Sequence, residues 1–353
     1  MITDIFSRRY KDVVIRSQYF EEDRRFMNQA AVMVLDPLWM GQESDKPSDY
    51  TEQSLKPVHD ALAMELGRES LSDRWWFSKR TWNGNTTTDS HAYSLSKICR
   101  NFLTKLPDNL EAADSHVKDR LSFIELAFQY RLRAIQRANL ELPARITEAE
   151  RADAAPHRGP GIRLPGRRAD GVRASNARMN ETFANLVDEL NQRIKLANYP
   201  LSFHNGMLQL ALDDTVTAQV AKPFWALVST PIWKNVDEQI KEAIDRRDRA
   251  DRTAAFHAVC ALESAIKIIS DTKGWTTSKE KGASNYIDNL VSEKNGRFID
   301  VWESEMLKSM FGDVRNPFAH GPGQGPMPKL SDDQTDWAID TSMSWIKSLI
   351  RRM

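Results

Sequence analysis

The stretch that decides the fold is F-G-D-V-R-N-P-F-A-H-G-P-G, residues 311–323. It follows a long helical pattern and ends in a Gly-Pro-Gly stop. Arg315 and His320 are five positions apart, so an uninterrupted helix would place them roughly 140° apart around its axis. Pro317 removes one backbone donor and biases Asn316 away from helical geometry. We therefore expect a bent or terminated helix that brings His320 back toward Arg315.

An arginine beside a histidine suits phosphodiester chemistry. Arg315 would present a planar fork of permanent positive charge that matches phosphate oxygens. His320 can move a proton near neutral pH, as a base toward an attacking hydroxyl or as an acid toward a leaving oxygen. The alternative is that Arg315 caps helix carbonyls and that His320 is only a loop residue before a glycine.

The composition is that of an ordinary soluble protein. The 353 residues include 28% charged and 41% hydrophobic residues with a formal net charge of zero, so any attraction to nucleic acid must be local. Cys99 and Cys260 lack CxxC spacing, and we see no acidic cluster or H-E-x-x-H run, so no metal site and no cofactor is predicted. Without a signal-peptide pattern or a membrane-length apolar run, the sequence predicts a cytoplasmic protein that makes no membrane contact.

Helical periodicity dominates the N-terminal part of the chain. Apolar residues at helical spacing predict helices over about 20–39, 55–66, 95–106 and 117–135. An aromatic cluster from Trp75 to Trp82 precedes a polar run, N-G-N-T-T-T, that we interpret as a loop. Asp89 is then the expected N-cap of the next helix. The whole segment is expected to be α-helical.

The composition changes between residues 156 and 178. This stretch holds three prolines, four glycines and six arginines against one acid, Asp170, which predicts neither a helix nor a strand. One interpretation is a solvated linker. The other is a basic arm that binds RNA or an acidic partner through Arg158, Arg163, Arg167, Arg168 and Arg173.

A small β-hairpin is predicted at Asn205-Gly206. Leu201, Phe203, Met207 and Gln209 alternate with other residues on either side of this dipeptide, which is a strong hairpin signal. The sequence therefore predicts a mainly α fold with two domains. The first, residues 1–222, is helical and ends in the hairpin, and the second, residues 223–353, is a four-helix bundle.

The four helices of the second domain follow Trp233. The first is expected to run through D-R-R-D-R-A-D-R into T-A-A-F-H-A-V-C-A-L-E-S-A-I-K, and the second covers about 283–291. The third spans about 297–314 with Trp302 and Met306 facing inward. Ser331 or Asp332 caps the last helix.

One carboxylate on the first of these helices lies among apolar groups. Glu263 and Lys267 are one turn apart on a face that also holds Cys260. They form either a surface ion pair or a site in which Glu263 reaches a basic group on a packed helix, such as Arg315.

The four-helix pattern with the R-N-x3-H motif at Arg315, Asn316 and His320 resembles a HEPN domain, the higher eukaryote and prokaryote nucleotide-binding fold. The runs A-L-E-S-A-I-K and A-H-G are similar to those of abortive-infection HEPN proteins. The N-terminal half resembles an AbiJ-type N-terminal domain in M-I-T-D-I-F-S-R-R-Y, E-E-D-R-R-F and D-E-L-N-Q-R.

The resemblance implies a metal-independent endoribonuclease, a toxin of abortive-infection antiviral defence that cleaves RNA by 2′-hydroxyl attack. Arg315, Asn316 and His320 would be its catalytic residues, with Glu263 and Lys267 in support. Family members commonly act as homodimers that face two motifs across one cleft, and an antitoxin or a phage-derived trigger is expected as a further partner. The alternative is a non-catalytic HEPN module that binds RNA or a nucleotide or serves as a scaffold.

Overall fold

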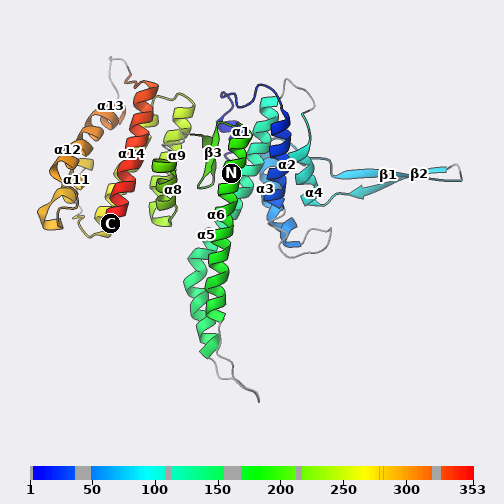
Figure 1. The fold of residues 1–353 in the computed structure, drawn as a ribbon, viewed down its shortest axis with the longest axis horizontal. Helices are drawn as coiled ribbons and strands as arrows, with labels where there is room; N and C mark the ends of the chain where they lie inside the picture. The colour runs from blue at the N-terminus through cyan, green and yellow to red at the C-terminus, as the bar shows by residue number, and fades with distance from the viewer. Residues whose placement is uncertain are drawn as a thin grey trace. The chain divides into compact units, whose positions relative to one another are not determined.

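The computed structural model describes residues 3–35, 49–83, 85–107, 113–154, 168–211, 217–277, 279–280, 282–319 and 327–353. Within these ranges the chain is mainly α-helical and has two antiparallel two-stranded sheets (Figure 1), so the predicted fold class is confirmed. Contacts divide the chain into two compact units, Met1–Leu208 and Gln209–Met353. This division lies N-terminal to the 222/223 boundary expected from the sequence.

The N-terminal unit is built from amphipathic helices. In the described ranges these are α1 (Phe6–Arg9), α2 (Glu21–Leu35), α3 (Asp49–Glu65), α4 (Leu95–Thr104), α5 (Ala113–Ala154) and α6 (Arg168–Leu196). α2 to α5 confirm the helices that the apolar spacing predicts, except that residues 36–39 of the first prediction lie outside the described ranges. Their apolar faces form one core, in which Phe26, Leu62, Phe102 and Phe123 are buried.

α5 and α6 form a long antiparallel pair (Figure 1). Most buried side chains of α5 lie between Ala113 and Ile135, and beyond Ile135 only Ala149 is buried. In the far half the two helices are joined by polar contacts. Asn139 Oδ1 accepts hydrogen bonds from the side-chain amides of Asn176 at 2.8 Å and Asn180 at 3.0 Å.

α6 begins at Arg168, so the prediction of a loop through residue 178 is wrong for residues 168–178. The Asp153 carboxylate at the end of α5 accepts hydrogen bonds from the backbone N–H groups of Arg168 at 2.9 Å and Ala169 at 3.4 Å. This contact satisfies two N–H groups that a helix start leaves open. It offsets the roughly 1 kcal/mol that Gly171 costs in a helix interior.

The aromatic cluster of the N-terminal unit is a β-hairpin, so the prediction of an all-helical segment is wrong here. β1 (Trp75–Trp82) pairs antiparallel with β2 (Asn85–Ala92), with Trp82 opposite Asn85. The turn begins at Asn83, whose φ of 47° lies in the left-handed region. Asn-Gly favours tight hairpin turns, and aromatic residues and threonine favour strands.

Asp89 does not cap a helix. It lies in β2 opposite Ser78. The N-cap of α4 is Ser94, whose hydroxyl accepts a hydrogen bond from the Lys97 N–H at 3.3 Å. Serine is a strong N-cap, and the strand ends shortly before it.

The second hairpin confirms the prediction made from Asn205-Gly206. β3 (Leu201–His204) pairs with β4 (Met207–Leu210), and both turn residues have positive φ, 41° and 88°. The Leu208 N–H donates a hydrogen bond to Glu125 at 2.6 Å. Glu125 also pairs with Arg9 at 2.7 Å, and both side chains are buried.

The C-terminal unit is also helical. Its helices are α8 (Lys222–Val228), α9 (Lys234–Asp248), α10 (Ala254–Thr272), α11 (Ala283–Val291), α12 (Val301–Ser309), α13 (Asn316–Ala319) and α14 (Asp332–Arg352), with π-helical turns η3 (Thr217–Ala221) and η6 (Met310–Arg315) and 3-10 turns η4 (Pro231–Trp233) and η5 (Glu293–Asn295). α10 packs on α9 and α14. The core along these helices includes Leu262, Ile266, Ile339 and Met343, all buried. α14 has Ser331, one of the two predicted caps, as its N-cap.

The prediction of one helix through D-R-R-D-R-A-D-R is wrong, because α9 and α10 are separate. Ala250 between them has a φ of 54°, which a continuing helix cannot contain. The Asp251 carboxylate accepts hydrogen bonds from the Thr253 N–H at 2.8 Å and the Thr253 hydroxyl at 2.7 Å. These local bonds compete with the helix and turn the chain.

The third predicted helix is shorter and oriented differently from the prediction. α12 starts at a capping box formed by Asp300 and Glu303. Trp302 is 59% exposed and Met306 is 49% exposed, so the prediction that they face inward is wrong. The inner face holds Leu307 and Glu303, whose carboxylate pairs with Arg352 at 2.8 Å. The prediction assumed that only apolar side chains of this helix face inward, and the paired Glu303 does not fit that pattern.

Candidate active site

The candidate site is organised by the π-helical turn η6. Its closing hydrogen bond runs from the Asn316 N–H to the Phe311 carbonyl, five residues back. Pro317 follows, and it has no N–H with which to continue an ordinary α-helix. The wider turn accommodates the missing donor, and Asn316 keeps a helical φ of −62° and ψ of −38°. The prediction that Asn316 leaves helical geometry is therefore wrong.

Arg315 is held at the end of η6. Its Nη2 lies 3.0 Å from Glu263 Oε2 on α10, and its Nη1 donates to Asn316 Oδ1 at 3.4 Å. The Arg315 side chain is 28% exposed, whereas that of Glu263 is 11% exposed. The guanidinium is thus fixed on one side and keeps some access to solvent on the other.

Glu263 holds two cations at once. Its Oε1 lies 2.8 Å from Lys267 Nζ, while Oε2 pairs with Arg315. The sequence left a surface pair with Lys267 and a pair with Arg315 as alternatives, and the structure contains both. One carboxylate against two cations leaves this group with a formal charge of +1, which favours a phosphate over a cationic ligand.

Cys260 belongs to the same neighbourhood, and no role was predicted for it. Burial raises the pKa of the Cys260 thiol, and the nearby Arg315 guanidinium opposes that shift. The thiol is therefore a neutral neighbour of the arginine at physiological pH. Its position on the helical face shared with Glu263 and Lys267 was the available signal.

The Nε atom of Arg315 is buried, and no residue that the structure describes accepts its hydrogen. A buried guanidinium N–H without an acceptor is costly. Together with the exposed Asn316 side chain, it marks the end of η6 as a place where polar groups have unused hydrogen-bonding capacity.

The remaining predicted residues lie either outside the described ranges or in the N-terminal unit. His320 lies outside the described residues, as do Arg158, Arg163 and Arg167. Arg168 is exposed at the start of α6. Arg173 pairs with Glu150 at 2.7 Å and Asp170 at 3.1 Å, so its charge is balanced locally.

A groove of about 300 Å³ borders η6 and was missed from the sequence. The lining of this η6 groove comes from α12, η6 and α14: Met306, Ser309, Met310, Asp313, Val314, Trp337, Thr341 and Trp345. Trp337 is 56% exposed, and Met306 contributes a second large apolar surface. The groove thus places exposed apolar surface of α12 and α14 beside the turn that carries Arg315.

The described ranges contain neither a cluster of metal-binding side chains nor a helix that could span a membrane. No three His, Cys, Asp or Glu side chains come close enough together there to hold a metal ion. Among the helices in those ranges, none combines the length and the apolarity that a bilayer crossing requires.

Two known families cover nearly the whole chain. Residues 4–226 match AbiJ N-terminal domain 4, and residues 234–352 match the HEPN-like domain. The C-terminal unit with the Arg315 site is therefore a HEPN-like domain of the abortive-infection type. The chain belongs to the AbiJ family, with an AbiJ N-terminal domain 4 followed by this HEPN-like domain. No curated protein and no solved structure matches it.

Proposed function

We propose that the chain is a metal-independent endoribonuclease that acts as a toxin in abortive-infection defence. The observation that carries the proposal is the Arg315 guanidinium, fixed against Glu263 in a group of net positive charge within a HEPN-like domain. A fixed cation needs little reorganisation to stabilise charge that develops on a phosphate. RNA is abundant in the cytoplasm, where such a toxin would act.

In this mechanism the RNA 2′-hydroxyl attacks the neighbouring phosphorus and the 5′-oxygen leaves. Arg315 would stabilise the charge on the phosphoryl oxygens, and Asn316 would orient the phosphate or His320. His320, five residues after Arg315, would transfer a proton, which contributes about 10²–10⁴-fold in rate. Glu263 and Lys267 would set the direction and local charge of the guanidinium. The products are a 2′,3′-cyclic phosphate and a 5′-hydroxyl.

The reaction needs both a base and an acid, and one chain supplies one motif histidine. A homodimer with two facing motifs would supply both, and a closed pair of this kind has twofold symmetry. The η6 groove supports this arrangement, because its exposed apolar residues, Met306 on α12 and Trp337 on α14, border the turn that carries Arg315. An antitoxin or a phage-derived trigger acting on the N-terminal unit would control the enzyme.

The test is RNA cleavage in EDTA by the wild type, Arg315→Ala and His320→Ala, with analysis of the product ends. Arg352→Ala is the matched control, because it removes another arginine–glutamate pair of the C-terminal unit, at 2.8 Å. The proposal predicts cyclic-phosphate ends from the wild type and the control only. Cleavage of DNA at a comparable rate would exclude 2′-hydroxyl attack.

A second candidate is a non-catalytic HEPN module that binds RNA or a nucleotide. The partly buried pair of Arg315 and Glu263 favours it, because the loss of one partner would destabilise the packing of η6 on α10. In that case RNA binds and stays intact, and Arg315→Ala lowers the unfolding temperature without any loss of chemistry.

A further inference from the structure

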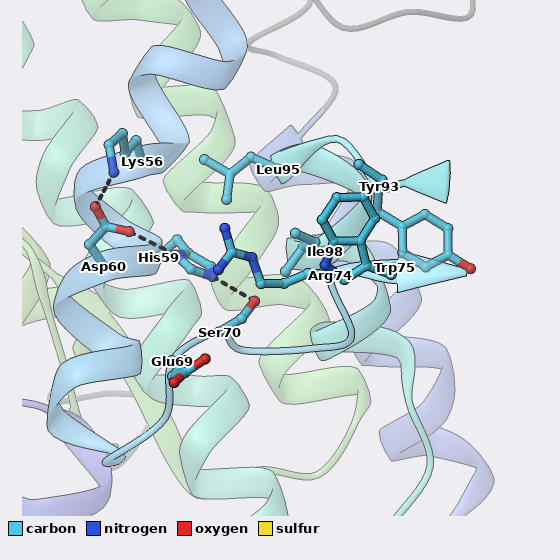
Figure 2. A pocket seen from close by; sticks show the side chains of 11 residues that line it. Lys56, His59, Asp60, Glu69, Ser70, Arg74, Trp75, Tyr93, Leu95 and Ile98 are labelled. Carbon is cyan, nitrogen blue, oxygen red and sulfur yellow. Dashed lines mark hydrogen bonds and ion pairs between the residues drawn. The ribbon is translucent and has the colours of Figure 1, made fainter. Parts of the chain in front are cut away.

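A pocket of about 400 Å³ opens at the root of the β1-β2 hairpin, within the N-terminal unit (Figure 2). Its walls come from α3, the loop before β1, both strands and the start of α4. The lining includes His59, Asp60, Arg74, Trp75, Tyr93 and Ile98. Pockets of this size hold small organic ligands, and a few polar groups on an otherwise apolar lining fix their orientation.

One part of the lining is a set of polar side chains held by hydrogen bonds to His59. His59 is 6% exposed, and its Nε2 accepts a hydrogen bond from the Leu71 N–H at 3.3 Å and lies 3.2 Å from the Ser70 hydroxyl. Since Nε2 accepts from an amide, the ring proton is on Nδ1, which donates to Asp60 at 2.9 Å. Ser70, His59 and Asp60 contact one another in the order of a hydrolytic triad. His59 cannot act as a base toward Ser70, however, because its Nε2 lone pair already accepts the Leu71 N–H.

The lining holds two acids, Asp60 and Glu69, and Asp60 is paired with a cation. Lys56 Nζ pairs with Asp60 Oδ2 at 2.5 Å, and the hydrogen bonds from Lys56 and His59 hold the pKa of the Asp60 carboxyl below its usual range. Asp60 is therefore an ionised, paired carboxylate. Because Asp60 is paired with Lys56, it does not compete with an anionic ligand for the remaining cation of the lining.

That cation is Arg74. Its side chain is exposed, and its guanidinium makes no hydrogen bond or ion pair with any residue in the described part of the chain. Figure 2 shows the Arg74 side chain reaching from the hairpin toward His59. A guanidinium at the mouth of a pocket is a ready partner for a phosphate, which it can bind through two N–H groups.

Aromatic surface lies beside this cation. Trp75 starts β1 and is 54% exposed, although it lines the pocket. Tyr93 lines the pocket beyond the end of β2, where its N–H donates to the Arg74 carbonyl at 2.9 Å. Exposed tryptophan faces bind aromatic ligands by stacking.

We propose that this pocket binds a nucleoside phosphate, with its base on Trp75 and its phosphate on Arg74. A nucleoside phosphate contacts both the aromatic residues and Arg74. A free phosphate would make no contact with the aromatic residues, and an apolar ligand would leave Arg74 desolvated and unpaired. The ligand is either a free nucleotide or one nucleotide of a single strand. A strand would continue along the same hairpin face, over Phe77, 67% exposed, and Lys79.

The test is calorimetric titration of the full chain with AMP, adenosine, inorganic phosphate and a ten-nucleotide oligoadenylate. We expect AMP to bind more tightly than adenosine or phosphate. Arg74→Ala should weaken AMP binding about tenfold and leave adenosine unchanged, because a charge-assisted contact is lost. Trp75→Ala should weaken both AMP and adenosine by roughly tenfold. Tighter binding of the oligoadenylate than of AMP identifies a strand as the ligand.

Trp82→Ala is the matched control. Trp82 is 80% exposed at the other end of β1, and strand alternation puts it on the opposite face from Trp75. The proposal is overturned if AMP and the oligoadenylate both fail to bind, or if Trp82→Ala weakens binding as much as Trp75→Ala does.

Arg315→Ala separates this proposal from the ribonuclease function, on which it does not depend. Nucleotide binding that survives Arg74→Ala and disappears in Arg315→Ala would assign the ligand to the HEPN-like domain and overturn the pocket proposal. Binding that survives Arg315→Ala and needs Arg74 supports the pocket whether or not the chain cleaves RNA.

Discussion

Glu263 Oε2 lies 3.0 Å from Arg315 Nη2, which joins the middle of α10 to the end of the π-helical turn η6. The two residues are far apart in sequence, and the arginine would otherwise point freely from the end of a short helix. The pair fixes the direction of the guanidinium before any RNA binds. The catalytic proposal therefore depends on a carboxylate that lies outside the Arg-Asn-His motif.

Glu263→Gln should lower the rate of RNA cleavage about tenfold or more, because the amide keeps the size of the side chain but holds Arg315 less firmly. The loss of unfolding free energy should be only about 1 kcal/mol, since Arg315 is partly exposed to solvent. Single-turnover cleavage and urea unfolding measure the two effects. Glu293→Gln is the control, as Glu293 pairs with Arg297 at 2.8 Å on the surface. Equal cleavage by both variants would contradict the positioning role.

Pro317→Ala should reduce cleavage about tenfold without lowering stability. Alanine restores an N–H, so an ordinary α-helical turn can replace η6 and rotate Arg315 away from Glu263. Cleavage assays and thermal unfolding on the same preparation test this. Pro143→Ala, which replaces an exposed proline within α5, is the control. An unchanged cleavage rate would show that the proline does not set the geometry.

Arg9→Ala should destabilise the protein by about 3–5 kcal/mol at pH 7, because it leaves the buried Glu125 carboxylate unpaired. Burial raises the pKa of Glu125, and Arg9 opposes that shift. A carboxyl whose folded pKa is raised stabilises the fold below its ordinary pKa and loses that contribution as pH rises through the folded pKa.

The defect of Arg9→Ala should therefore be smaller at pH 5 than at pH 7. Urea unfolding at both pH values measures it, and Arg24→Ala, which removes an exposed pair with Glu21, serves as the control. A defect that grows toward pH 5 would contradict the burial argument.

Cys260 should react with iodoacetamide more slowly than free cysteine at pH 8, because burial raises its thiol pKa and the thiolate is the reactive form. The rate should keep rising above pH 9. Cys99 is fully buried, so a Cys99→Ser variant should show the same reaction. Mass spectrometry after timed labelling measures the rates. Labelling of Cys260 as fast as free cysteine at pH 8 would contradict the shift.

Met306→Glu should convert the proposed homodimer into a monomer and abolish cleavage, because it puts a charge into the η6 groove. Trp302→Glu is the control, since Trp302 is exposed on α12 but does not line the groove. Light scattering after size-exclusion chromatography gives the masses. RNA cleavage by a monomeric wild-type protein would contradict the proposal that cleavage requires a dimer formed through the η6 groove.

Local patterns predicted most of the helices and one of the two hairpins. Asn205-Gly206 was interpreted as a turn because alternating apolar residues flank it. Asn83 precedes a glycine in the same way, but the tryptophans of β1 are exposed and do not alternate with polar residues, so the pattern gave no strand signal. Contacts between residues distant in sequence explain two further errors in the fold. Asp153 starts α6, and Arg352 allows Glu303 to occupy an inward position.

The candidate site was predictable only in the part that depends on local sequence patterns. The helical face of Glu263 and the motif arginine were visible in the sequence, and their pairing was one of two alternatives. The π-helical turn was not visible, because hydrogen-bond registry around a proline depends on packing against α10. The η6 groove was not visible either. Met306 lines it because this residue and Trp302 face outward, and this orientation of α12 depends on tertiary contacts such as the pair of Glu303 with Arg352.

The α5-α6 pair has a consequence for how the chain unfolds locally. Its near half is fixed in the core of the N-terminal unit, whereas its far half relies on asparagine contacts and exposed ion pairs. Amide protons there should exchange with deuterium through small openings that leave the core intact, so protection should fall stepwise from Phe128 toward Ala149. A protease that cuts within the far half of the pair would then leave two fragments still held together by the near half.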